Sequence, residues 1–114
     1  MPLTAGKRDE ENERFKNTLQ RLVALTFVPD NFEKIDSELS TFGLNLESLQ
    51  KMTADDLMAH IKMQKLDFEN LEQFADFLAA GFPMLAKAAY EFVQHNSGTF
   101  SFVIFNKLAA LKLP

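Results

Sequence analysis

Two acid–histidine pairs are the residues of this chain whose types and spacing best suit chemistry. Asp56 lies four residues before His60, and Glu91 lies four residues before His95. Residues four apart share one face of an α-helix, so each pair would present a carboxylate and an imidazole in the same direction. Both groups bind transition metals, and the pairs therefore raise the hypothesis of a metal-dependent enzyme.

The same spacing also fits exposed helical pairs, and it places His95 favourably near the C-terminus of a helix. A metal site in a helical bundle needs further inward-facing carboxylates, and the pattern predicts none. The chain also lacks glycine-rich phosphate loops, nucleophile elbows, zinc-protease motifs and cysteine. We therefore expect a non-enzymatic protein with no catalytic residue, metal or cofactor, and keep the two pairs only as alternative metal candidates.

Two other polar features fit structural roles better than catalytic ones. Helical spacing places four polar residues within one narrow sector, which we expect to face solvent: Glu69, Glu72, Gln73 and Asp76. Tyr90 is the one tyrosine of the chain, and we expect it to be half-buried with its hydroxyl hydrogen-bonded.

Charge is spread unevenly along the sequence. Residues 1–27 carry five basic and four acidic side chains, residues 28–76 carry four and eleven, and residues 77–114 carry three and one. The acidic middle segment would repel phosphate backbones, so we expect no nucleic-acid partner, although a helix, a glycine turn and a helix over residues 74–92 resemble a helix-turn-helix in outline. Charged residues at the N-terminus and the absence of cysteine favour a cytoplasmic location.

Phenylalanine is the unusual residue of this composition. The chain has twelve Phe and no Trp, and eight of the Phe residues lie between positions 68 and 105. Phe has no polar tip, so most of these rings are expected in the core. Some of them are candidates for an apolar interface or a ligand pocket: Phe74, Phe77, Phe92, Phe100, Phe102 and Phe105. Three more, at the ends of predicted elements, are candidates for exposed dimer contacts: Phe27, Phe32 and Phe82.

Hydrophobic periodicity predicts helices throughout the chain and no pair of strands. Residues 1–8 are predicted to form a disordered arm, and residues 9–114 a single all-α domain of five to seven helices. Predicted N-caps are Asp30, Asn45, Thr53 and Asp67, and predicted stops are Gly43, Gly81 and Gly98. The segment 46–51 is short enough to be either a helix or a single helical turn.

The C-terminal stretch TFSFVIFNKL, residues 99–108, determines the predicted architecture. A lone strand would leave its backbone groups unpaired, and about 12 residues are too few to cross a bilayer as a helix. A helix that is apolar on every side is normally buried. We therefore predict that the bundle is built around this Phe-rich helix, or that a second subunit completes its cover.

These patterns favour a module for protein association, through self-association as a homo-oligomer or through another protein partner. The alternative is a carrier that holds a hydrophobic small molecule between the Phe-bearing helices. A metal-dependent enzyme using His60 and His95 is the third hypothesis.

Overall fold

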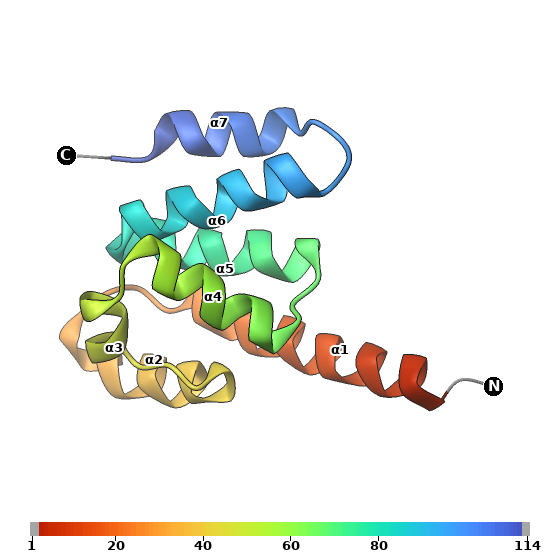
Figure 1. Cartoon of the computed structure of the whole chain (residues 1–114). Helices are drawn as coiled ribbons and strands as arrows, with labels where there is room; N and C mark the ends of the chain where they lie inside the picture. The colour runs from red at the N-terminus through yellow and green to blue at the C-terminus, as the bar shows by residue number, and fades with distance from the viewer. Residues whose placement is uncertain (1–2, 113–114) are drawn as a thin grey trace.

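The computed structural model describes the backbone of residues 3–112 and the side chains of residues 10–112. Over this range all of the regular secondary structure is helical, which confirms the predicted all-α class (Figure 1). The seven α-helices of the described residues are α1 (Leu3–Ala24), α2 (Phe32–Leu39), α3 (Leu46–Lys51), α4 (Ala54–Gln64), α5 (Phe68–Gly81), α6 (Pro83–Asn96) and α7 (Phe102–Ala110). Two short 3-10 helices, η1 (Pro29–Asn31) and η2 (Ser40–Phe42), flank α2.

The first helix starts earlier than the sequence indicated. It begins at Leu3 and not at Asp9, and its first turns project beyond the other helices in Figure 1. Residues 1 and 2 lie outside the described residues. The division into a disordered arm over residues 1–8 and a domain over residues 9–114 stays a prediction.

Side-chain caps start three of the helices as the sequence predicted. Asn45 accepts a hydrogen bond from the backbone N–H of Ser48, and the Ser48 hydroxyl accepts one from the N–H of Asn45. Thr53 and Asp56 form the same reciprocal capping box before α4. The Asp67 carboxylate accepts from the N–H of Asn70 before α5. Residues 46–51 therefore form a true helix. Its start is capped by Asn45, and at its end the N–H of Met52 donates to the backbone oxygen of Ser48.

Replacing Thr53 by alanine should lower the free energy of unfolding by about 1 kcal/mol, because it leaves the N–H of Asp56 without its acceptor. Thr53→Ser keeps a hydroxyl at the same place and should retain most of the stability. Urea unfolding of the two variants measures the difference. Equal losses in both would show that the hydroxyl cap has no role.

The expected cap at Asp30 is wrong. Asp30 lies inside η1, and α2 follows directly at Phe32. Asn31, at the junction, makes no cap hydrogen bond with its side chain and instead donates its amide to the backbone oxygen of Thr26 at 3.0 Å. The 3-10 turn leads into α2 with helical backbone angles, so this junction uses no side-chain cap.

The centre of the bundle is α5. It packs against α6 along its length and against α1 on another side (Figure 1). A chain of rings crosses this centre from Phe15 through Phe42 and Phe74 to Phe77, with centroid separations of 5.2, 5.3 and 6.2 Å. All four rings are buried, so the aromatic residues join α1, η2 and α5 into one core.

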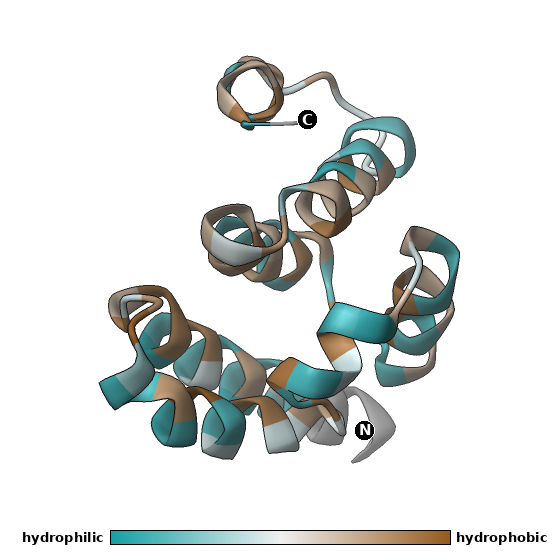
Figure 2. Cartoon of the chain, turned by 90° about the vertical axis from the view of Figure 1, so that its left-hand side faces the viewer, coloured by the Kyte–Doolittle hydropathy of each residue, from teal (hydrophilic) through white to brown (hydrophobic). Residues whose placement is uncertain are grey.

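The prediction that the bundle surrounds the C-terminal helix is wrong. α7 is helical, as expected, but it lies at the edge of the molecule and packs mainly on α6. Figure 2 views it end-on, at the top edge of the bundle and coloured largely in the hydrophobic range. Ile104 is its one buried residue among those described. Apolar residues all round a helix show that it needs cover, but they do not specify which neighbours provide it.

None of the described helices combines the length and the hydropathy needed to cross a bilayer.

Candidate functional site

The start of α7 and the residue before its N-cap carry exposed apolar side chains, which we call the aromatic face: Phe100, Phe102, Val103 and Phe105. Their exposed fractions are 60, 75, 58 and 55%. The rings of Phe102 and Phe105 both contact that of Phe100, with centroids 5.1 and 6.0 Å apart. The three rings therefore form one cluster rather than scattered apolar residues, and Val103 adds a further exposed apolar side chain next to Phe102 in the chain.

The lead-in to α7 is fixed by hydrogen bonds. The side-chain amide of Gln94 donates to the backbone oxygen of Ser101 at 2.9 Å, and the Ser101 N–H donates to Gln94 Oε1 at 2.8 Å. The Ser101 hydroxyl caps α7 by accepting from the N–H of Ile104. The preceding turn uses Gly98 at a φ of +86°, a conformation that glycine adopts without strain. The aromatic face is thus held in place on α6.

An ion-pair cluster attaches the other end of α7 to the core. The Lys107 ammonium donates to Glu72 Oε2 at 2.7 Å and lies 3.0 Å from Asp76 Oδ1, both on α5. The Tyr90 hydroxyl on α6 donates to the same Asp76 carboxylate. Glu72 and Asp76, which the sequence placed on a solvated face, are instead less than one-third exposed, because α7 covers them.

The pKa shifts in this cluster favour the protonated forms of Lys107 and Tyr90, which are the forms that donate hydrogen bonds to the carboxylates. Burial lowers the pKa of Lys107, but hydrogen bonds to Glu72 and Asp76 outweigh it, and the pKa lies above its ordinary value. Burial and the hydrogen bond to Asp76 raise the pKa of Tyr90 well above its ordinary value. Tyr90 is 2% exposed, so the expectation of a half-buried ring is wrong, whereas its hydroxyl is hydrogen-bonded as expected. A buried phenol held protonated is suited to structure and not to proton transfer at neutral pH.

Alkaline pH should destabilise the protein through Tyr90. Above pH 10 the unfolded chain releases the phenolic proton while the folded chain retains it, so the unfolded state binds fewer protons. The free energy of unfolding should then fall by about 1.4 kcal/mol per pH unit more in the wild type than in Tyr90→Phe. Because the chain has one Tyr and no Trp, tyrosinate absorbance reports this group alone. Tyrosinate that forms near pH 10 without unfolding would contradict the assignment.

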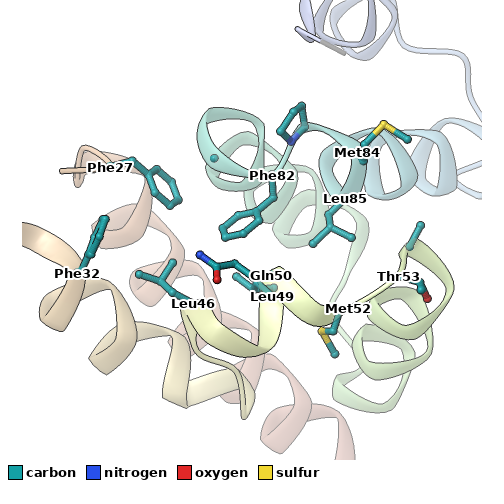
Figure 3. A pocket seen from close by; sticks show the side chains of 13 residues that line it. Phe27, Phe32, Leu46, Leu49, Gln50, Met52, Thr53, Phe82, Met84 and Leu85 are labelled. Atoms are coloured by element: carbon teal, nitrogen blue, oxygen red, sulfur yellow. The ribbon is translucent and has the colours of Figure 1, made fainter. Parts of the chain in front are cut away.

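A second apolar surface, which we call the apolar groove, lies where the ends of several helices meet (Figure 3). Its volume is about 640 Å³. The lining is mainly apolar and comes from the segment after α1, the start of α2, the α3–α4 region and the α5–α6 junction. It consists of Phe27, Phe32, Leu46, Leu49, Gln50, Met52, Thr53, Ala54, Gly81, Phe82, Pro83, Met84 and Leu85.

Close packing at Gly81 positions one wall of the groove. A Cβ atom at Gly81 would lie 2.8 Å from Cε1 of Phe27, so glycine allows the ring to approach the end of α5. Phe27 then stacks on Phe77 of the core at 5.2 Å and contacts Phe82 edge-on at 5.9 Å. The aromatic core therefore extends through Phe27 to the wall of the groove at the surface.

The Phe residues predicted for an interface or pocket separate into three groups. Phe74 and Phe77 are buried in the core, and Phe92 is partly buried against Phe68, with the Lys62 ammonium 5.3 Å from its ring centroid. The other three belong to the aromatic face, and none of the six lines the apolar groove.

The groove instead brings together the three Phe residues expected at element ends, Phe27, Phe32 and Phe82. The methionines of the groove and the ion-pair cluster were not predicted from the sequence. The sequence signal for the cluster was Lys107, a single charged residue within the otherwise largely apolar helix α7.

The four metal candidates have separate surroundings in the structure. Asp56 caps α4, and a ring nitrogen of His60 donates to the backbone oxygen of Phe42. Since the carbonyl accepts, Nε2 of His60 carries the proton. Glu91 and His95 are exposed on α6. Among the described residues, no group of three or more His, Cys, Asp or Glu side chains is placed to hold a metal ion.

Comparisons with protein-family models, curated proteins and solved structures found no match to this chain.

Proposed function

We propose that the protein is a non-enzymatic self-association module that uses the aromatic face of α7. The observation that carries the proposal is the exposure of three adjoining Phe rings and Val103 at the start of a helix whose position is fixed by hydrogen bonds and ion pairs. Aromatic side chains concentrate in the cores of protein interfaces, and an apolar patch of this kind is unfavourable in water. Covering it with another protein surface removes that unfavourable exposure.

Sedimentation velocity over a range of protein concentrations tests the proposal. The wild type should self-associate reversibly at micromolar concentrations. The double variant Phe102→Asp/Phe105→Asp should weaken association by about tenfold or more, because charged groups would have to be buried at the contact. Met63→Asp is the matched control, since Met63 is 80% exposed and lies on α4. A monomeric wild type, or equal association of both variants, would contradict the proposal.

The apolar groove supports a second candidate, a carrier of a hydrophobic small molecule. Its volume of about 640 Å³ falls within the size range of small-molecule sites, and its lining offers apolar contacts with few polar groups. Native mass spectrometry of protein freshly purified from cells should then detect a bound lipid-like mass, which is reduced in Met84→Glu. The absence of such a mass, together with failure of a fluorescent fatty-acid probe to bind, would reject the carrier.

A further inference from the structure

We infer that the aromatic face of one copy docks into the apolar groove of a second copy. The inference rests on the proposed function and adds to it the surface that receives α7. It assigns the groove to a protein occupant, and it makes the contact between copies head-to-tail, with a different surface contributed by each side.

Shape favours this pairing over contact between two α7 helices. The aromatic face projects from the edge of the bundle, with Phe102 three-quarters exposed, whereas the groove is a concave site of about 640 Å³. Projecting rings bury more surface in a hollow than against a second projecting face. Phe102 and Phe105 are three residues apart on one helix, the spacing with which helices insert anchors into grooves.

The open side of the groove also favours a protein. Phe32 and Met84 remain 40 and 55% exposed at its edge. Small-molecule sites usually bury most of their ligand, whereas a groove with exposed apolar edges suits a helix laid across it. The methionines Met52 and Met84 supply adaptable apolar contacts of the kind used to hold aromatic anchors.

The sequence around the groove is acidic, whereas the segment that carries the aromatic face is basic. The charged residues within two positions of a groove-lining residue have a net charge of −2, from Asp30, Glu33, Glu47, Asp55 and Asp56 against Lys34, Lys51 and Lys87. The segment 97–112 has no acidic residue and carries Lys107 and Lys112. Lys107 is paired within its own chain, so Lys112 carries the remaining positive charge of this segment.

The two surfaces of one chain do not meet each other. No residue of α7 lines the groove, and in Figure 3 the pale blue ribbon of α7 lies beyond Met84, outside the groove. The ion pairs of Lys107 hold α7 to α5, and the Gln94–Ser101 hydrogen bonds hold its start to α6. Contact between face and groove therefore joins different copies, in a closed reciprocal dimer or in an open chain.

Mixing two complementary variants tests the inference. Phe102→Asp/Phe105→Asp loses the aromatic face and keeps the groove, whereas Met84→Glu loses the groove and keeps the face. Each variant alone should associate about tenfold more weakly than the wild type or worse. An equimolar mixture should form a heterodimer through its one intact contact and should grow no further. Phe32→Glu provides a second groove variant, and Met63→Glu is the control for an added charge elsewhere.

The outcomes distinguish this inference from the proposed function. If both groove variants associate as well as the wild type and the mixture gives no heterodimer, α7 helices pair with each other; the inference is then overturned and the proposed self-association stands. A monomeric wild type overturns both. A monomer that binds anionic vesicles through the aromatic face would also overturn both, because the face would then serve a lipid surface.

Discussion

Replacing Phe74 by alanine is expected to lower the free energy of unfolding by about 3–5 kcal/mol, the largest effect of any single change considered for this protein. Phe74 is 1% exposed and lies at the middle of the ring series, next to Phe42 and Phe77. Its removal leaves a cavity between α5 and η2 that rigid neighbouring rings cannot fill. Urea unfolding followed by circular dichroism measures the loss.

Phe68→Ala is the matched control for this variant. Phe68 lies on the same helix but is 40% exposed and makes its aromatic contact with Phe92 at 6.3 Å. Its removal should cost about 1 kcal/mol or less, because the site is open to water and leaves no enclosed cavity. Similar losses in the two variants would show that the ring series does not form the centre of the fold.

Replacing Lys107 by methionine should cost about 1.5–3 kcal/mol, the second-largest effect. Methionine keeps the length of the side chain but removes the cation that separates two half-buried carboxylates, Glu72 and Asp76. These carboxylates would then lie beneath α7 without the ammonium group that pairs with both of them. The variant should also weaken self-association, because α7 would no longer be held in one position.

Lys112→Met removes the same charge from an exposed position of the same segment, and it should change stability little. Hydrogen exchange gives the local readout: amides of residues 102–110 should exchange faster in Lys107→Met, while those of α5 change less. Equal exchange of α7 in both variants would contradict the role of the ion pairs in holding the helix.

Local signals in the sequence were sufficient to predict the starts of three helices, α3, α4 and α5. The caps at Asn45, Thr53 and Asp67 act between residues three apart, so sequence spacing alone specifies them. Gly43, at a φ of +72°, follows the same local rule at the end of η2. Asp30 failed as a cap because Pro29 starts a 3-10 turn that leads directly into the next helix.

The position of α7 depended on packing between distant elements, which periodicity does not encode. Its apolar composition correctly predicted a helix and indicated that this helix needs cover. The centre of the bundle is α5 instead, because α1 and α6 both pack on it. The groove was likewise beyond the sequence, because its walls come from positions 27 to 85 and meet only after folding. The ends of predicted elements nonetheless indicated three of its rings, Phe27, Phe32 and Phe82.

Backbone amide NMR spectra recorded at increasing protein concentration test most directly whether a second copy covers the aromatic face. Concentration-dependent shifts are expected at residues 100–106 and at the groove segments 27–33, 46–54 and 81–85, with the remaining amides little changed. Spectra that superimpose at every concentration, or shifts confined to other helices, would contradict cover by a second copy.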